Sequence, residues 1–274
     1  MGIRINTNVA SINTRRHLYN ATTRYQKSME KLSSGLRINR AADDAAGLAI
    51  SEGLRSDIRA LHQASRNASD GISMVQTAEG ALDEVSNILL RLRELTEQSL
   101  NGTLTDVERT YLDNEFQALL SEVDRISNSV EFNGQNLLDG SGGTVAIQVG
   151  ITTATYDSID VDLNTATDAT TLGLVGSIDS AANATAAMTQ VLGAVGTVSS
   201  RRSDFGAIQN RLEVSIRNIN NQAENLSAAN SRIRDVDVAQ ETSTMTSNQI
   251  LQQAGVSMLA QANMTTGLAM TLLS

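Results

Sequence analysis

The stretch LSSGLRINRAADDAAGLAIS, residues Leu32–Ser51, decides how this chain is organised. Runs of apolar residues at helical spacing lie before it and after it. Gly35 and Gly47 lower the helix propensity of the stretch, and its serines and aspartates compete for the helical backbone through their own side chains. The stretch therefore predicts a joint between two helical regions, with the charged pair Asp43-Asp44 placed to dock on another surface.

The composition favours long helices with narrow seams. The 274 residues include no proline and no cysteine, and aromatic residues make up only 3%. Because proline breaks helix interiors, its absence suits long uninterrupted helices. Large aromatic side chains usually dominate a compact core, so the interior here is predicted to be aliphatic and rich in alanine. Without cysteine, disulfides and thiolate chemistry are excluded.

The charge and hydropathy of the chain exclude several classes of partner. A net charge of −9 argues against nonspecific binding of nucleic acid. The chain contains no run of 18 apolar residues, so no membrane-spanning helix is predicted. The opening MGIRINTNVAS lacks the basic start and apolar core of a cleaved secretory signal. Taken alone, these features predict a cytoplasmic protein with no membrane insertion.

Three long runs predict the main helices. The first extends from near Ala46 to Asn101-Gly102, and the second begins at Thr105 with a capping-box pattern and ends at about Ser129. The third begins near Ser180. The first carries a heptad seam of Val75, Ala78, Leu82, Val85, Leu89 and Leu92, and the third carries a seam of Phe205, Ile208, Leu212, Ile216, Ile219, Ala223 and Leu226. These two seams are predicted to pack against each other.

Between the second and third runs the period of the pattern changes to two. Asn133-Gly134 is a strong signal for a tight turn. Apolar residues then alternate over 145–151 and again over 159–163, which predicts two short strands in a hairpin. The residues around them are Thr, Ser, Gly and Asp, which are typical of an exposed, irregular surface.

The two ends of the chain are predicted to be arms. The first arm, 3–31, carries a thin apolar stripe that includes Tyr19, so a helix there is marginal and is expected to stay disordered until a partner covers it. A second joint, Ser231–Asp235, precedes the last apolar run. Two apolar arms at opposite ends of one chain need a partner, either each other or neighbouring subunits.

The predicted fold class is therefore mainly α: a bundle of long coiled-coil helices with a short β-hairpin region, in which the N- and C-terminal helices pair. The predicted domains are discontinuous. Residues 1–45 with 235–274 form the terminal arms, and residues 46–234 form a helical bundle with a short β-rich insert at about 139–180.

No group of residues has the spacing of a catalytic or metal site. His17 and His62 lie on separate predicted helices, whereas the helical zinc motif needs two histidines four residues apart. Asp43 and Asp44, if adjacent on a helix, point about 100° apart and do not converge on a metal, which favours a salt bridge across subunits. The sequence predicts no enzyme, cofactor or metal.

Several stretches of the chain, in order, resemble bacterial flagellins. Besides Leu32–Ser51 they are Ile3–Thr14 (IRINTNVASINT), Asp70–Leu82 (DGISMVQTAEGAL), Leu92–Ser99 (LRELTEQS), Glu131–Gly140 (EFNGQNLLDG), Ser200–Glu213 (SRRSDFGAIQNRLE), Ser231–Glu241 (SRIRDVDVAQE) and Gln249–Asn263 (QILQQAGVSMLAQAN). The resemblance implies a structural subunit of the extracellular flagellar filament, in a minimal form without large outer domains. It further implies export in the unfolded state and self-assembly into a helical tube for motility.

The resemblance also implies partners and assembly residues. The partners are other copies of the chain, the flagellar export apparatus, a secretion chaperone, and the filament cap and junction proteins. The paired arms would line the central channel of the filament. The residues assigned to subunit assembly are Ile5, Val9, Ile12, Arg40, Asp43, Asp44, Leu251, Met258, Leu272 and Leu273.

One segment has two interpretations. RLRELTEQ, Arg91–Gln98, resembles the patch that animal Toll-like receptors recognise in some flagellins, with Glu115 at the matching acidic position of the adjacent helix. The candidate receptor contacts are Arg91, Glu94, Leu95, Gln98 and Glu115. The alternative is that they are surface residues near a helix seam, with ordinary charge pairs between Arg91 and Glu94 or Glu97.

Other functions compete with that of a filament subunit. A hook–filament junction protein has the same kind of terminal arms, but the close match at Leu32–Ser51 and the short insert favour flagellin. A signalling or adhesion ligand is a further alternative, and an enzyme lacks a site.

Overall fold

The computed structural model describes residues 7–271, with side chains described for 7–264. It contains two compact units. The arm unit consists of Met1–Ser56 and Asn225–Ser274, and the bundle unit consists of Asp57–Glu224. The predicted domain limits at 45 and 235 both lie within the arm unit.

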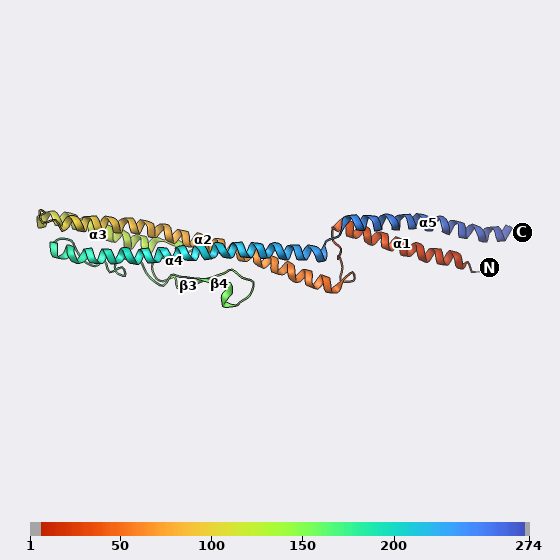
Figure 1. Cartoon of the computed structure of the whole chain (residues 1–274), viewed down its shortest axis with the longest axis horizontal. Helices are drawn as coiled ribbons and strands as arrows, with labels where there is room; N and C mark the ends of the chain where they lie inside the picture. Colours follow the sequence, from red (N-terminus) through yellow and green to blue (C-terminus); the bar gives the residue numbers. More distant parts are fainter. Residues whose placement is uncertain (1–6, 272–274) are drawn as a thin grey trace. The chain divides into compact units, whose positions relative to one another are not determined.

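The fold is mainly α, which confirms the predicted fold class (Figure 1). The helices are α1 (Val9–Ser34), α2 (Ala45–Ser99), α3 (Asp106–Ser129), α4 (Ala181–Arg234) and α5 (Val238–Thr271), with a 3₁₀ turn at Thr155–Asp157. The strands are β1 (Glu131–Phe132), β2 (Gln135–Asn136), β3 (Thr144–Gln148) and β4 (Ser158–Asp162). Helices α2 and α4 each contribute residues to both units.

The core of the bundle unit is a heptad seam on α2. Buried residues recur at alternating spacings of three and four along it, as the sequence predicts. They are Leu61, Ala64, Ala68, Val75, Ala78, Leu82, Val85, Leu89 and Leu92. Helix α3 packs Phe116, Leu120 and Val123 into the same core. Helix α4 contributes Ala184, Ala187, Val191, Ala194, Val198, Phe205, Leu212 and Ile219.

The predicted pairing of the two seams is only partly right. Arg202 on α4 bonds Asp83 on α2 at 2.9 Å, and the two helices run in opposite directions (Figure 1). Ile219, seventeen residues after Arg202, therefore lies at the level of residue 66 on α2, below the Val75–Leu92 seam. By the same count that seam faces residues 193–210 of α4, which include only the start of the predicted partner seam, Phe205 and Ile208. Sequence analysis missed the alanine-rich heptad run from Ala184 to Val198, which lies opposite residues 87–101 and extends the buried face of α4.

Local signals placed the start of α3 and the turn at Asn133-Gly134 correctly. The hydroxyl of Thr105 accepts a hydrogen bond from the backbone N–H of Glu108 at 3.4 Å, and the Glu108 carboxylate accepts one from the N–H of Thr105 at 2.7 Å. This is the predicted capping box. Asn133 and Gly134 have φ of 52° and 78°, so they form the predicted tight turn, between β1 and β2.

The predicted hairpin is also present. Strands β3 and β4 pair in antiparallel register, with Val145 opposite Val161 and Ile147 opposite Ile159. Within the hairpin the predicted alternation of apolar and polar residues holds, because Ile147, Ile159 and Val161 are buried while their neighbours are more exposed.

The segment that follows β4 corrects a prediction. Its Thr, Ser and Asp content predicts an exposed, irregular surface, but Leu163, Leu172, Leu174 and Ile178 are buried. Side chains of α3 hold its backbone: Asp124 accepts a hydrogen bond from the N–H of Ala169 at 2.8 Å, and Asp113 from that of Ile178 at 2.7 Å. The apolar residues are spaced too irregularly for a periodic pattern to reveal them.

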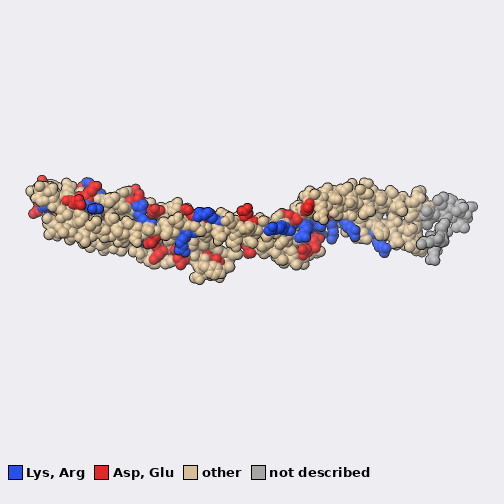
Figure 2. All heavy atoms as spheres, in the orientation of Figure 1, with Lys and Arg blue, Asp and Glu red and all other residues tan. Residues whose placement is uncertain are grey.

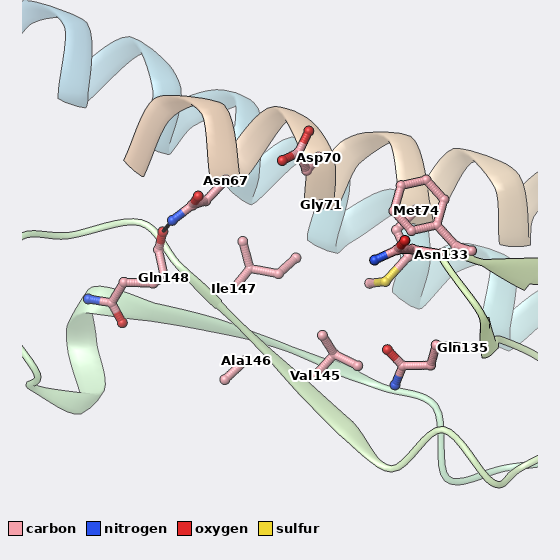
Figure 3. A pocket seen from close by; sticks show the side chains of 11 residues that line it. Asn67, Asp70, Gly71, Met74, Asn133, Gln135, Val145, Ala146, Ile147 and Gln148 are labelled. Atoms are coloured by element: carbon pink, nitrogen blue, oxygen red, sulfur yellow. Dashed lines mark hydrogen bonds between the residues drawn. The ribbon is translucent and has the colours of Figure 1, made fainter. Parts of the chain in front are cut away.

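Strand β3 is docked on α2 through a glycine. Figure 3 shows Ile147 pointing from β3 toward Gly71, and a Cβ added at Gly71 would overlap the Ile147 side chain. The Asn67 amide adds a 3.2 Å hydrogen bond to the carbonyl of Gln148. Beside this contact lies a hollow of about 380 Å³ between α2 and β3. The absence of a side chain at Gly71 therefore sets how closely the hairpin approaches the helix.

We expect Gly71→Leu to destabilise the bundle unit by about 1–3 kcal/mol, because overpacking forces the hairpin away from α2. Gly80 is the matched control, since it is exposed on the same helix and an added Cβ would meet no atom within 4 Å. Gly80→Leu is expected to be neutral or stabilising, by up to about 1 kcal/mol, because leucine favours helix over glycine. Thermal unfolding followed by circular dichroism measures both. Equal effects of the two substitutions would contradict this account.

Candidate functional site

The first candidate site is the pair of joints, which lie against each other in the arm unit. Helix α1 ends at Gly35, whose φ of 72° suits the left-handed position after a helix. Leu36 then forms a β-bridge with Asp235 of the second joint. The N–H of Arg37 donates to the carbonyl of Arg234 at 2.7 Å, and the N–H of Val236 donates to that of Gly35 at 3.0 Å. Two segments some 200 residues apart in sequence thus form one backbone-bonded unit.

Arginines surround this backbone contact. The Arg37 guanidinium donates to the carbonyl of Ile233 at the end of α4. Arg234 bonds Glu52 on α2 at 2.6 Å, and Arg40 bonds Glu30 on α1 at 2.8 Å. Of these residues, sequence analysis assigned a contact role only to Arg40, although it placed Ile233 and Arg234 in the second joint. The others belong to pairings between distant segments, for which local periodicity carries no signal.

The structure places the aspartate pair in the joint itself. Asp43 and Asp44 lie in the turn before α2 and not on a helix, which is a correction. Asp44 caps α2, because its carboxylate accepts a hydrogen bond from the N–H of Gly47 at 2.8 Å. The Asp43 carboxylate accepts bonds from the N–H groups of Asn39 and Arg40 at 3.3 and 3.1 Å. Both carboxylates are thus occupied in holding the joint itself.

Two carboxylates of the joint have lowered pKa values. A hydrogen bond from Arg234, followed by one from Arg55, lowers the pKa of Glu52 from its ordinary 4.5. The backbone N–H of Arg40 is the main cause that lowers the pKa of Asp43 from 3.8. Because both values are lowered by folding, their contribution to stability is present at neutral pH and is lost as the pH falls through the lowered values.

The second candidate site is the pair of arms. Helices α1 and α5 run antiparallel in contact, which confirms the predicted pairing of the terminal helices. The Asn8 amide donates to the carbonyl of Ala262 at 2.9 Å, and Lys31 lies 3.7 Å from Glu241 at the other end. The residues buried between the two helices are small or polar: Ala21, Ser28 and Asn248. The sequence predicts that α1 stays disordered until a partner covers it. In the structure, α5 covers it.

Many large apolar side chains of the arms are exposed, although Leu18 on α1 lies against Gly255 on α5. Met258 is 62% exposed, and the other exposed apolar residues are Val9, Ile12, Tyr19, Ile250, Leu251, Val256 and Met264. A groove of about 620 Å³ runs between the helices beside Leu251, Gly255 and Met258. Ile5, Leu272 and Leu273, predicted for assembly, lie outside the described residues. The arm pair therefore leaves its apolar side chains available for another surface.

Charge differs between the two arms. Helix α1 carries five lysines and arginines and one glutamate, whereas Glu241 is the only charged residue of α5. Figure 2 shows this contrast, with basic side chains along α1 and an uncharged surface over α5 up to the grey residues.

The candidate receptor patch is only partly on the surface. Arg91 bonds Glu94 at 2.9 Å and Glu115 at 2.8 Å, and these side chains and Gln98 are exposed. Leu95, in contrast, is 0% exposed. Its prediction as a surface contact is wrong, because α2 packs against both α3 and α4 and so buries a wider stripe than one seam would.

The described part of the chain also shows neither a metal-binding cluster nor a membrane-spanning helix. There, no three side chains of His, Cys, Asp or Glu come together in an arrangement that suits a metal ion. No helix among the described residues has a segment long and apolar enough to cross a bilayer.

Comparison with known proteins gives consistent matches at both ends of the chain. The family model for the bacterial flagellin N-terminal helical region matches residues 5–143, and that for the C-terminal helical region matches 175–273. A flagellin of Halalkalibacterium halodurans is 49% identical over 94% of this chain and 95% of its own length. The flagellar filament 33 kDa core protein of Treponema phagedenis is 44% identical over 98% and 99%. The crystal structure of Bacillus cereus flagellin aligns with a TM-score of 0.52 and 32% identity, over 60% of this chain and 94% of that one.

We expect acid to loosen the joint before the bundle. As the pH falls through the lowered pKa values of Glu52 and Asp43, which lie below 4.5 and 3.8, protonation removes acceptors from Arg234 and the turn. The amides of Arg37 and Val236 should then lose protection against hydrogen exchange. Protection factors, which correct for the intrinsic rate of exchange, measure this. Glu52→Gln should lower protection at pH 7 already. Glu122→Gln removes a similar exposed pair with Arg125 on α3 and should leave the joint unchanged. Equal effects of both variants would contradict a role of Glu52 in the joint.

Proposed function

The chain belongs to the bacterial flagellin family, and we propose its function on that basis. It is a structural subunit of the flagellar filament, as its relatives named flagellin and filament core protein are. The family is structural, and we propose that this chain catalyses no reaction. His17 and His62 lie on different helices, in different units.

The observation that carries this function is the inverted polarity of the arm pair. Small and polar residues lie between α1 and α5, while Leu251, Met258 and their neighbours are exposed. Complete burial of one such side chain contributes about 1.5–3 kcal/mol. A row of them along two helices is therefore a surface that gains free energy when other copies cover it, as in a polymer.

Assembly would couple ordering of the arms to association. With few buried apolar residues, the arm pair gains little free energy from folding alone, so the neighbouring copies that cover it would also stabilise its fold. A repeated contact between unlike surfaces that does not close generates a helical polymer. In this proposal the arms, 1–45 with 235–274, form the inner core of the tube, and Val9, Ile12, Arg40, Leu251 and Met258 contribute contacts between subunits.

The proposal includes the route of the chain to the filament. Export through the flagellar apparatus with a secretion chaperone, growth under a cap beside junction proteins, and an extracellular location are what membership of the family supports. A hook–filament junction protein is the less favoured alternative, because the relatives at 44–49% identity are named as flagellin and filament core protein.

Removal of about forty residues from either end is expected to leave a folded, monomeric bundle that does not polymerise. The reason is that either truncation deletes one member of the arm pair, while the seams of α2, α3 and α4 in the bundle unit remain. Circular dichroism measures the remaining helix, sedimentation the mass, and electron microscopy the growth from filament seeds. Normal filaments from either truncated chain would refute the assembly role of the arms.

A second proposal concerns recognition of the monomer by a Toll-like receptor. It is supported by the exposed network of Arg91, Glu94 and Glu115, which joins α2 to α3. Arg91→Ala should reduce receptor signalling by monomers at least tenfold if this network is an anchor, since a few residues dominate such interfaces. Arg125→Ala is the control, because it removes an arginine with an exposed carboxylate partner elsewhere on α3. A reporter cell line measures the response, and equal signalling by both variants would exclude this patch.

A further inference from the structure

We propose that Met258 and Met264 on α5 are oxidation sites, and that their conversion to methionine sulfoxide in the monomer blocks its assembly. Both residues belong to the exposed apolar surface of the arms. This inference rests on the proposed filament function and adds a way in which that same surface is regulated.

The exposure of methionine differs between the two units. Among the side chains that the structure describes, every methionine that is exposed lies in the arm unit: Met29 at 47%, Met258 at 62% and Met264 at 57%. In the bundle unit, Met74 on α2 is only 6% exposed, and Met188 on α4 is partly buried. An oxidant in solution therefore reaches the arm methionines more readily than those of the bundle.

Methionine is the residue type of this chain that a peroxide oxidises most readily, because the chain has no cysteine and no tryptophan. The thioether sulfur attacks one oxygen of hydrogen peroxide, so that an S–O bond forms and the O–O bond breaks. The sulfur loses two electrons, and the leaving hydroxide takes up the proton of the transferred oxygen and departs as water. The product is methionine sulfoxide, which two methionine sulfoxide reductases convert back, one for each epimer.

Each of the two methionines belongs to a stripe of exposed apolar side chains on α5. Met258 follows Leu251 by seven residues, and Met264 follows Ile250 by fourteen, so the members of each pair lie on one face of the helix. Methionine adapts its shape to its neighbours and is common on surfaces that bind other proteins. Oxidation makes the side chain polar, which disrupts an interface of this kind. Both stripes therefore lose an apolar member when the sulfur atoms are oxidised.

The surroundings of Met258 show why the added oxygen opposes assembly. Met258 lines the groove of about 620 Å³ between α1 and α5, and the α5 side of this groove is apolar apart from Asn248. Glu241 is the only charged residue of α5. In the monomer, water hydrates a sulfoxide oxygen at this exposed position. An apolar surface of a neighbouring copy would remove that water without replacing its hydrogen bonds, which costs free energy.

Sensitivity to oxidation is then confined to the time before assembly. In the monomer, both sulfur atoms lie on exposed side chains. In the proposed polymer, neighbouring copies cover the arms and shield them from the oxidant. A chain that meets peroxide as a monomer is therefore excluded from the filament, whereas a chain that has already been incorporated is protected.

Treatment of the full-length monomer with hydrogen peroxide, followed by seeded polymerisation, tests the proposal. Mass spectrometry of peptides measures the sulfoxide at each methionine, with Met74 as the reference for a buried thioether. The test variant is Met258→Leu with Met264→Leu, which keeps apolar side chains of similar volume but removes both sulfur atoms. The control variant is Met188→Leu in the bundle unit, which keeps both proposed sites. Circular dichroism checks that each variant is folded.

In the monomer, we expect Met258 and Met264 to form sulfoxide about tenfold faster than Met74, because susceptibility follows exposure. Peroxide treatment of the unaltered chain and of Met188→Leu should raise the concentration needed for filament growth by about tenfold or more. The two reductases, supplied with a thiol reductant, should reverse that rise. The variant without both sulfur atoms should grow equally well before and after treatment.

Normal growth of chains that carry both sulfoxides would overturn the proposal, and so would an equal loss of growth in the variant that lacks both sulfur atoms. Either result leaves the filament function intact. If the untreated, unaltered chain forms no polymer on seeds, the filament function itself fails, and the proposed regulation fails with it.

Discussion

The backbone contact between the two joints is the constraint on which the arm unit depends. Arg37 and Val236 donate to the carbonyls of Arg234 and Gly35, so the end of α1 is tied to the start of α5. Because both joints share these bonds, the two terminal helices leave the contact together and run antiparallel. The arginines around the contact bond Ile233, Glu52 and Glu30, and so connect each joint to the helices beside it.

The bundle and the pair of arms bury different kinds of residue. In the bundle unit, leucine, valine and alanine at heptad spacing are buried. Between the paired helices α1 and α5, the buried residues are alanine, serine and asparagine, and most of the large apolar side chains are exposed. The first arrangement stabilises a single chain, whereas the second stabilises an assembly. This division explains how one chain can be a folded monomer and a polymer subunit, because the surfaces that associate are not those that hold the bundle together.

The sequence predicted what depends on neighbouring residues and missed what depends on distant ones. The α2 seam, the capping box at Thr105 and the hairpin at β3 and β4 follow from local periodicity, and all are present. Which residues of α4 lie opposite a given residue of α2 depends on the lengths of α3, the strands and the loops between the two helices. Local periodicity does not give this register, so the predicted partner seam on α4 lay too late in the sequence. Leu95 was misplaced because its neighbours Arg91 and Gln98 are exposed, while two helices cover its own side. The joint arginines carry no periodic signal at all.

Seeded polymerisation of a variant with a more polar arm surface tests the central claim most directly. Leu251→Gln with Met258→Gln keeps side chains of similar length on exposed positions of α5, so the monomer should fold as before. Leu192→Gln makes the same type of change on α4 of the bundle unit. The account predicts that only the α5 variant raises the concentration needed for filament growth, by about tenfold or more, since two half-buried apolar contacts are worth over 1.4 kcal/mol. Unchanged growth of the α5 variant, measured by light scattering and electron microscopy, would contradict it.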